Sequence, residues 1–419
     1  MRPLLLLACC VCWAGSDGPQ LRKQYDAHRM FELRRALKEP SVDSNAISFY
    51  RAVVEARFGR EEKAVDSLHR FLETHPDSDL ERKANQELAG AFERLGRYGD
   101  AAEAWSRVIK QTSAKDKDRA DQLNTQQLDD SLRDVPRQSV RFGEAKMIQA
   151  TRNGVGTWNV PVEVNGTAGE WIFDTGANIS TITESEARRM KLMVRDSKAY
   201  VSGSTGKKNP LRLAIANELR LGGVRLSNVV FLVLNDQALH IGPIKYQING
   251  IVGLPVLRLL GRVTMSAEGA MRVQATEPMS SGEPNLFFEE LTPMVAAGHR
   301  GRELQLFLDT GNNTTFLYPS SRQAFSGEER ANLIRRREQM GGAGGVMKHT
   351  VEVIPSLTFE ILGSRVELKA LSLLSKQPKG ELQYRDGVFG ADVLANGFTI
   401  DFGAMEFRIQ LSRAVARLA

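Results

Sequence analysis

An internal duplication in the C-terminal two thirds of the chain constrains the fold more than any other feature. The tripeptide Asp-Thr-Gly occurs at 174–176 and again at 309–311, each time after a run of apolar residues. About 80 residues after each copy comes a matching segment of two apolar residues and a glycine, which ends at Gly253 in the first copy and at Gly390 in the second. A repeat of about 135 residues indicates two similar structural units in one molecule.

Both units have sequence patterns typical of β-strands. From Met147 onward, short β-branched and aromatic runs alternate with glycine and asparagine, as in 158–164 and 170–173. We therefore predict a mainly β architecture, with one unit over residues 147–275 and the other over residues 276–419.

A basic residue followed by an apolar run opens the chain. Arg2 precedes the apolar stretch 4–14, which is too short to cross a membrane and resembles a secretory signal. We predict a signal peptide over residues 1–15 and export of the remaining chain. The stretch 6–9 also resembles a lipoprotein cleavage box, which would place a lipid anchor at Cys9.

The composition excludes several function classes. With 42% hydrophobic and 25% charged residues, the chain is globular rather than collagen-like, wholly disordered or multi-span. A formal charge of +6 over 419 residues falls short of the concentrated basic footprint of a nucleic-acid binder. All three cysteines lie within residues 1–15, so the mature chain would have no disulfide and no thiol nucleophile. The six histidines show no paired spacing, which argues against a zinc peptidase, and no Gly-x-Ser-x-Gly elbow accompanies a plausible acid and base.

The region before the duplication has helical periodicity. Gly59 and Ala64 share their spacing and their surroundings with Gly96 and Ala101. These two units, over residues 45–111, resemble tetratricopeptide repeats, which would offer a surface to a protein partner. An ordinary helical hairpin without a binding groove is the alternative.

Two further segments flank these repeats. We predict a helical segment over residues 16–44 before them. Residues 112–146 are charged and glutamine-rich, so we predict a linker or a solvated helix there.

Together these motifs resemble the aspartic peptidases, specifically retropepsin-like domains, here duplicated in one chain. The resemblance covers residues 147–410 and rests on both Asp-Thr-Gly copies and both apolar-apolar-Gly segments. It implies a bilobal pair of β-barrels with pseudo-two-fold symmetry, preceded by a small all-α domain. It further implies that Asp174 and Asp309 form a catalytic dyad that hydrolyses a peptide or protein substrate without a metal or another cofactor.

The chemistry of peptide hydrolysis accounts for a pair of aspartates. Without a metal or a covalent intermediate, the reaction needs a base that activates water and an acid that protonates the substrate, and two carboxyls that share one proton serve as both. The resemblance gives seven residues the task of supporting the two loops: Thr175, Gly176, Thr310, Gly311, Asn312, Gly253 and Gly390.

The two copies differ in the residue that follows the tripeptide, which is Ala177 in the first and Asn312 in the second. Because a side-chain amide donates hydrogen bonds and a methyl group does not, we expect Asn312 to bind the carboxylate of Asp309 and make it the more acidic of the pair. On this hypothesis Asp174 holds the shared proton.

Glycine-rich stretches follow each tripeptide by about 30 residues. They resemble the flap tips that close over the site in this family: Gly203, Ser204, Thr205 and Gly206 in the first copy, and Gly342, Ala343 and Gly344 in the second. Ordinary hairpin loops are the alternative. The second copy also has a charged insertion over 320–340, which we expect to be helix-like and solvated.

We therefore predict an exported aspartic endopeptidase. Glycosylation sequons at Asn178, Asn312 and Asn313 would put glycans beside the catalytic loops, which favours a bacterial periplasm, cell envelope or extracellular location. The main alternative is a catalytically inactive envelope protein that binds peptides or acts as a scaffold on the same fold. Lobes that pair between two chains, or a dimer formed through the helical repeats, are further alternatives.

Overall fold

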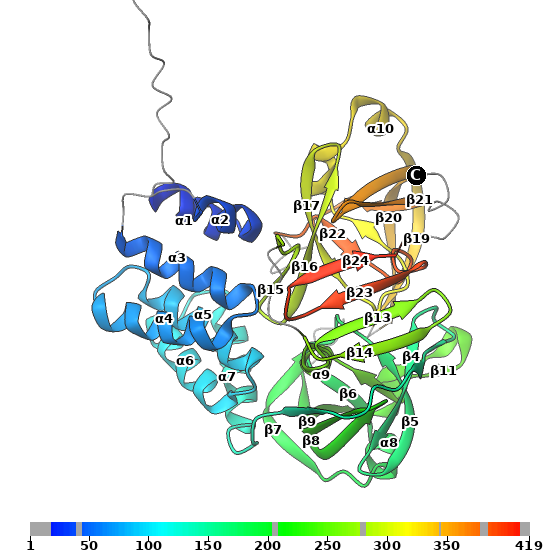
Figure 1. Cartoon of the computed structure of the whole chain (residues 1–419), viewed down its shortest axis with the longest axis horizontal. Helices are drawn as coiled ribbons and strands as arrows, with labels where there is room; N and C mark the ends of the chain where they lie inside the picture. The colour runs from blue at the N-terminus through cyan, green and yellow to red at the C-terminus, as the bar shows by residue number, and fades with distance from the viewer. Residues whose placement is uncertain are drawn as a thin grey trace, which may run out of the picture.

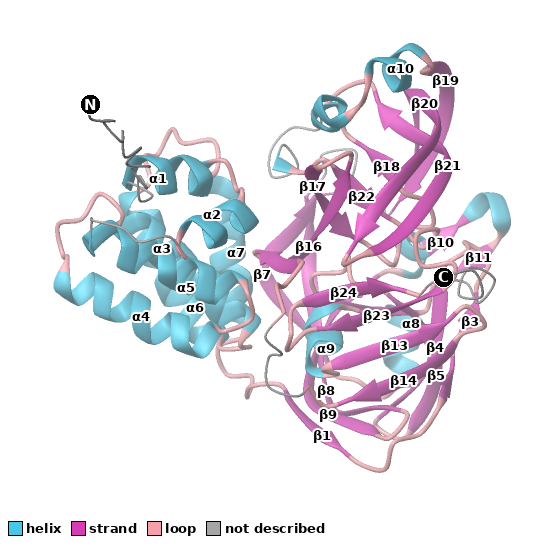
Figure 2. Ribbon diagram, turned by 45° about the horizontal axis from the view of Figure 1, so that its top comes forward, coloured by secondary structure: helices cyan, strands magenta, loops and turns pink. Residues whose placement is uncertain are grey.

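The computed structural model describes residues 18–38, 44–202, 208–276, 282–342, 345–377 and 384–410. A helical region stands beside two β lobes, and a further sheet lies between the lobes (Figure 1). Most of the helix is gathered on one side of the molecule (Figure 2). The prediction of a mainly β, bilobal chain with an N-terminal helical region is confirmed. The predicted signal peptide, with Cys9, lies outside the described residues.

The helical region consists of seven helices in the described ranges: α1 (Gly18–Asp26), α2 (Met30–Ala36), α3 (Ser44–Arg57), α4 (Glu61–Thr74), α5 (Glu81–Arg94), α6 (Tyr98–Gln111) and α7 (Arg119–Ser131). Helices α3 to α6 form two hairpins, and Gly59 and Gly96 turn the chain with φ angles of 78° and 67°, which suit glycine. Ala64 and Ala101 are fully buried, so the helices approach closely. Membership of the tetratricopeptide family stays a prediction. None of the described helices is long and apolar enough to span a membrane.

The segment 112–146 forms a helix and a strand rather than an extended linker. Helix α7 packs against α6, and its Asp129 is buried. The strand β1 (Ser139–Phe142) pairs with a strand of the first lobe, so the sheet of that lobe already begins before residue 147.

The first lobe consists of β3 (Thr151–Arg152), β4 (Trp158–Val164), β5 (Thr167–Phe173), β6 (Ser180–Thr183), α8 (Glu184–Arg189), β7 (Val194–Ser202), β8 (Lys208–Leu221), β9 (Val224–Leu234), η1 (Asp236–Leu239), β10 (His240–Ile241), η2 (Gly242–Ile244), β11 (Tyr246–Gln247), β12 (Gly250–Val252) and α9 (Leu254–Leu259). Six strands form a ring in the order β9-β6-β12-β5-β4-β8, which closes because β8 also pairs with β9. The lobe is therefore a closed barrel whose inward side chains form one core.

The second lobe consists of β15 (Leu286–Glu289), β16 (Thr292–His299), β17 (Arg302–Leu308), β18 (Phe316–Leu317), η3 (Pro319–Ala324), α10 (Gly327–Ala331), β19 (Ile334–Gly342), β20 (Gly345–Ile361), β21 (Ser364–Leu374) and β22 (Gly387–Phe389). Its ring has the order β16-β17-β22-β18-β21-β20, and β16 closes it by pairing with β20. The second ring thus repeats the first, strand for strand.

A five-stranded sheet joins the lobes. It has the order β2-β14-β13-β23-β24 and consists of β2 (Ile148–Gln149), β13 (Arg262–Ser266), β14 (Ala270–Gln274), β23 (Gly397–Asp401) and β24 (Glu406–Ile409). Thr264 of β13 lies opposite Thr399 of β23, and their hydroxyls are 3.1 Å apart. These two residues occupy equivalent places in the repeat, so the pseudo-two-fold axis passes between them.

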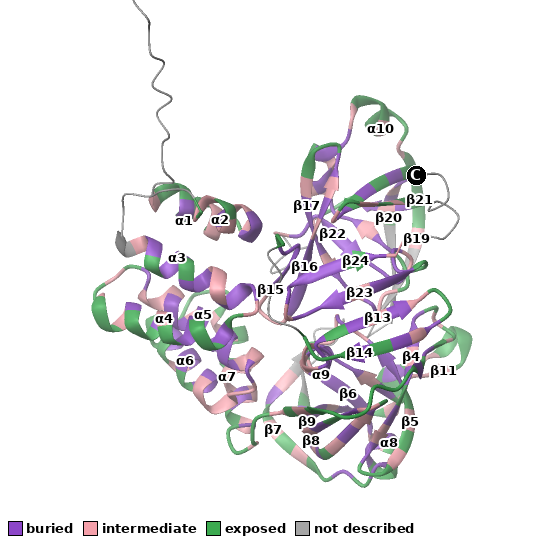
Figure 3. Ribbon diagram, viewed as in Figure 1, coloured by how far each residue is buried: buried purple, intermediate pink, exposed green. Residues whose placement is uncertain are grey.

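The helical region docks onto both lobes. Phe287 of β15 is 1% exposed, and its ring lies 5.0 Å from that of Phe31 and 5.8 Å from that of Phe58. Figure 3 colours residues of α3 and of β15 as buried, and Phe287 shares one buried apolar cluster with Phe31 and Phe58. The inner apolar face of the helices is therefore filled by the chain's own second lobe.

Charged groups also hold the helical region against the two lobes. Buried Arg57 of α3 contacts Glu87 of α5 and Glu289 of β15, both at 2.8 Å. On the first lobe, Arg258 of α9 pairs with Glu61 and donates to the Arg94 carbonyl at 2.8 Å. Arg94 also donates to the Glu290 carbonyl at 2.9 Å, so this one residue of the helical region contacts both lobes.

The expectation of a helix-like insertion over 320–340 holds for its first part and is wrong from residue 334 onward. After the short η3 and α10, residues 334–342 form strand β19, which pairs with β20. Arg335, Arg336 and Arg337 are exposed along this strand. Backbone pairing places no demand on side chains that face solvent, so a charged run fits an outer strand.

Candidate active site

The two Asp-Thr-Gly loops are positioned by the same strand arrangement in each lobe. Strand β5 ends at Phe173 and runs parallel to β12, and the Asp174 N–H donates to Val252 O at 3.0 Å. In the second lobe β17 runs parallel to β22, and the Asp309 N–H donates to Phe389 O, also at 3.0 Å. Each aspartate thus leaves its barrel at an equivalent point.

The threonines tie the two loops together across the lobe boundary. The Thr175 N–H donates to Thr310 Oγ1 at 3.0 Å, and the Thr310 N–H donates to Thr175 Oγ1 at 3.1 Å. Each hydroxyl then donates to a carbonyl of the opposite lobe, Thr175 to Leu308 O at 2.5 Å and Thr310 to Phe173 O at 2.7 Å. Both threonines are fully buried, so these four bonds fix the loops relative to each other without competition from water.

The glycines of the tripeptides leave room for the opposite aspartate. A Cβ atom on Gly176 would lie 2.5 Å from Asp309 Oδ1, and one on Gly311 would overlap the carboxyl of Asp174 in the same way. The close approach of the carboxyls therefore requires glycine at both positions.

The two carboxyls hydrogen-bond to each other, and burial raises the pKa of both because it penalises their charged forms. For Asp174, backbone N–H groups of Gly176, Gly311 and Ala177 oppose burial and stabilise the charge. For Asp309, burial and the neighbouring charge of Asp174 act together, and they raise its pKa well above the usual range. The two carboxyls therefore titrate as one unit, in which burial favours a state with a shared proton over two ionised groups.

The expectation that the Asn312 side chain acidifies Asp309 is wrong. The backbone N–H of Asn312 donates to Asp309 Oδ1 at 3.1 Å, a bond that most residue types would provide. The side-chain oxygen of Asn312 accepts instead from the Thr314 N–H at 3.4 Å. Asparagine readily bonds its own backbone two residues on, and here that local turn directs the side chain.

The remaining predicted support residues, Gly253 and Gly390, lie behind the loops. A Cβ on Gly253 would lie 2.7 Å from Ala177 O, and one on Gly390 would lie 2.5 Å from the Thr314 carbonyl carbon. The residue after each glycine donates to the loop, Leu254 to Ala177 O and Ala391 to Asn312 O. Both glycines therefore allow a strand to back directly onto its loop.

Three support residues escaped the sequence analysis. Ser180 Oγ accepts from the Gly253 N–H, and Thr315 Oγ1 accepts from the Gly390 N–H, both at 3.0 Å. Asp392 binds the hydroxyl of Thr315 at 2.5 Å and its N–H at 2.8 Å. A hydroxyl residue stands six positions after each catalytic-loop aspartate, and this repeated spacing would have revealed two of the three.

The first lobe matches the family model of aspartyl proteases. The match covers residues 160–256, a range that includes Asp174 and Gly253. Among solved structures the chain is similar to a retropepsin-like aspartic protease from Rickettsia conorii, with 17% sequence identity, 32% of this chain and 94% of that chain covered, and a TM-score of 0.25. No curated protein matches the chain. The family model supports an aspartic peptidase in the first lobe.

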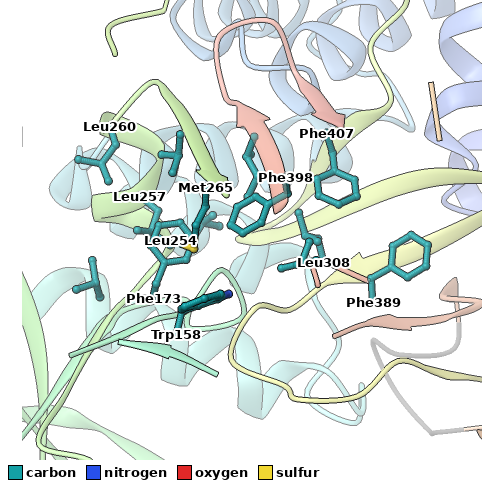
Figure 4. Close-up of a cluster of buried hydrophobic side chains, with 14 of the residues drawn as sticks. Trp158, Phe173, Leu254, Leu257, Leu260, Met265, Leu308, Phe389, Phe398 and Phe407 are labelled. Carbon is teal, nitrogen blue, oxygen red and sulfur yellow. The ribbon is translucent and has the colours of Figure 1, made fainter. Parts of the chain in front are cut away.

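A cluster of apolar side chains packs against the residues that precede the two loops. Phe173 and Leu308, the residues before the two aspartates, lie among side chains from both lobes and from the joining sheet (Figure 4). The ring of Phe173 is 6.3 Å from that of Phe398, a residue of β23. Both loops therefore rest on one continuous core, which links their positions.

The predicted flap residues lie at or beyond the limits of description. Gly203, Ser204, Thr205, Gly206, Ala343 and Gly344 lie outside the described residues, and Gly342 is the last residue of β19. The strands that lead to these positions are described: β7 with β8, and β19 with β20, are paired hairpin arms. Among the described residues, no group of three or more His, Cys, Asp or Glu side chains is placed to hold a metal ion.

Proposed function

We propose that this protein is an exported aspartic endopeptidase in which Asp174 and Asp309 form the dyad. The observation that carries the proposal is the contact between the two carboxyls, which four threonine hydrogen bonds hold in place across the lobe boundary. Such a contact costs stability, because burial and charge repulsion raise the pKa of the pair. A peptidase that uses two carboxyls with one proton is the function that explains this cost.

In the proposed reaction, ionised Asp174 takes a proton from a water molecule while the oxygen of that water attacks the scissile carbonyl carbon. Asp309 gives its proton to the carbonyl oxygen, which produces a tetrahedral diol. As the C–N bond breaks, Asp174 gives its new proton to the leaving nitrogen, and Asp309 recovers a proton from one diol hydroxyl. The carboxylic acid product and the amine depart, and the dyad returns to its initial protonation.

The substrate and location follow from separate observations. A peptidase of this class acts on a peptide or protein substrate, and this chemistry needs no cofactor. Export rests on the charged and apolar opening of the chain over residues 1–15. Periplasm, cell envelope and exterior all fit this opening.

Cleavage of a peptide library by the purified mature protein from about pH 3 to about pH 8 tests the proposal. We expect Asp174→Asn and Asp309→Asn each to reduce cleavage by about a thousandfold or more, because neither carboxyl alone supplies both base and acid. The matched control is Asp66→Asn, the same change at an exposed position on α4, which should retain wild-type rates.

Two outcomes would contradict the proposal. If either aspartate variant kept its activity, the two lobes would not form one dyad. Folded wild-type protein that bound library peptides without cleaving them at any pH would favour the inactive peptide-binding alternative.

A further inference from the structure

Strand β7 is the edge strand of the first lobe. It pairs with β8 on one side and is the last strand in the sheet order. An edge strand presents backbone N–H and C=O groups that need partners. The partner of this edge comes from the helical region, because α7 packs along β7.

The pairing of β7 with β8 is irregular where α7 contacts it. The register shifts between Asp196 and Tyr200, and beyond the shift Tyr200 lies opposite Pro210, which has no N–H to donate. Pairing with β8 is therefore weaker at this point than along a regular ladder, and the arm needs support from elsewhere.

Asn124 of α7 supplies that support at Tyr200. Its Nδ2 donates to Tyr200 O at 3.0 Å, and its Oδ1 accepts from the Tyr200 N–H at 2.8 Å. A side-chain carboxamide has the same donor and acceptor as a peptide group, so Asn124 reproduces one rung of a neighbouring strand. An aspartate could accept from the N–H but could not donate to the carbonyl.

Other contacts along the same helix fix its distance from the strand. Ser131 Oγ lies 2.9 Å from Ser197 Oγ, and Arg195 donates to Ser131 O at 2.7 Å. Leu132, just after α7, and Ala199 of β7 share a buried apolar cluster. Helix α7 is thus held against β7 at several points, and Asn124 is the contact nearest the end of the arm.

We infer that Asn124 is a positioning residue: it fixes the backbone of β7 at Tyr200 and so sets the position of the β7/β8 hairpin for substrate binding. Strand β7 ends at Ser202, two residues beyond Tyr200, and there it pairs with Lys208 of β8, so an error at Tyr200 displaces the described end of both hairpin arms. The effect on substrate binding rests on the proposed function, whereas the contact itself does not.

The test compares wild-type full-length protein with Asn124→Ala and Asn124→Asp, and with Thr125→Ala as the matched control on the same helix. In the described part of the chain, the Thr125 hydroxyl donates to Asp121 O of its own helix. We expect the Tyr200 amide to exchange its hydrogen roughly tenfold faster in Asn124→Ala, because the bond from its N–H is lost, and near the wild-type rate in Asn124→Asp, whose carboxylate still accepts that bond. We also expect KM to rise roughly fivefold or more while kcat changes less than about twofold.

Each measurement has a decisive result. Unchanged exchange at Tyr200 in Asn124→Ala would overturn the contact, and faster exchange with unchanged KM would overturn the positioning role. A fall in kcat with KM unchanged would place the effect at the chemical step instead. The exchange measurement needs no turnover, so a wild-type protein without peptidase activity would defeat the proposed function and still decide whether Asn124 holds the strand. Thermal unfolding midpoints establish that each variant is folded, and Asn124→Asp keeps the side-chain shape if Asn124→Ala does not fold.

Discussion

At their aspartates the two lobes closely repeat each other, whereas they contact the helical region through different elements. Asp174 and Asp309 have equivalent backbone partners, equivalent cross-lobe threonine bonds and an equivalent glycine behind them. Outside this centre, the second lobe inserts Phe287 into the helices, and the first lobe is bound along β7 by polar contacts together with a small apolar cluster. The meeting of the two carboxyls requires symmetric loops, but anchoring each lobe requires only that some surface be complementary.

Two buried carboxyls of the docked structure also differ in their charged neighbours. Burial acts to raise the pKa of Glu289 on the second lobe's side, but Arg57 and His28 outweigh it and lower this pKa to about 2. Between α5 and α7, within the helical region, burial and the neighbouring Glu93 raise the pKa of Asp129 well above its usual range. The docking contact at Glu289 and the α5–α7 contact should therefore respond to pH in opposite directions.

The strongest test of the central symmetry is to add one methyl group to each lobe in turn. We expect Gly176→Ala and Gly311→Ala each to reduce kcat/KM by roughly a thousandfold, because each new Cβ overlaps the opposite carboxyl and a displacement of about 1 Å already costs roughly a hundredfold. Peptide cleavage measures this, with Gly327→Ala, where a Cβ has open space, as the control. If one variant alone were inactive, the lobes would not be equivalent at the dyad.

The second test compares the pH dependence of the docking contact at Glu289 with that of the α5–α7 contact at Asp129. The Glu289 contribution to the free energy of unfolding is present above its ordinary pKa of 4.5 and is lost as pH falls towards 2, so it is on the order of 3 kcal/mol. The Asp129 contribution is fully present below its ordinary pKa of 3.8 and is lost as pH rises through its raised value. Urea unfolding across pH should show that Glu289→Gln flattens the acid side and Asp129→Asn flattens the alkaline side.

The exposed Asp66→Asn variant is again the control, and it should leave both sides of that profile unchanged. Parallel shifts in Glu289→Gln and Asp129→Asn would show that the two contacts respond to pH in the same way, and this result would contradict the expectation.

The smallest effect is expected where the two loops differ in sequence. Because the Asn312 side chain bonds Thr314 rather than Asp309, Asn312→Ala should change kcat/KM by less than about twofold at any pH. The reciprocal Ala177→Asn variant should be equally silent. A pH–rate profile checks both variants. An acidic limb displaced by about one pH unit in Asn312→Ala would instead support a bond between the Asn312 side chain and Asp309.

The duplication predicted two similar β units, and the resemblance that its local motifs carry implied two barrels whose aspartates meet. Each Asp-Thr-Gly loop follows a strand, and a distant glycine, Gly253 or Gly390, lets a second strand pack directly behind the loop. The residue types therefore carry much of the loop geometry. The direction of the Asn312 side chain was not predictable in this way. The Asn312 side chain could bond either the Asp309 carboxylate or the Thr314 N–H, and the sequence contains both partners.

The docking of α7 was missed for a different reason. Sequence periodicity reports wide apolar faces, whereas this helix contacts β7 through a small apolar cluster and through the polar groups of Asn124, Ser131 and the backbone of Tyr200. The strand at 334–342 was missed similarly, because its three exposed arginines carry no alternating apolar pattern and its pairing is made by the backbone. Polar contacts between distant segments leave little trace in a single sequence.

The position of Phe287 has a consequence for the order in which the chain is built. Its partners Phe31 and Phe58 are synthesised more than 200 residues earlier, so the helices emerge with an open aromatic socket that only the second lobe fills. Until β15 arrives, that socket is an exposed apolar surface of the kind that recruits chaperones or aggregates. The first part of the protein to be translated is thus among the last to be completed, and a chain truncated before residue 287 would carry the defect permanently.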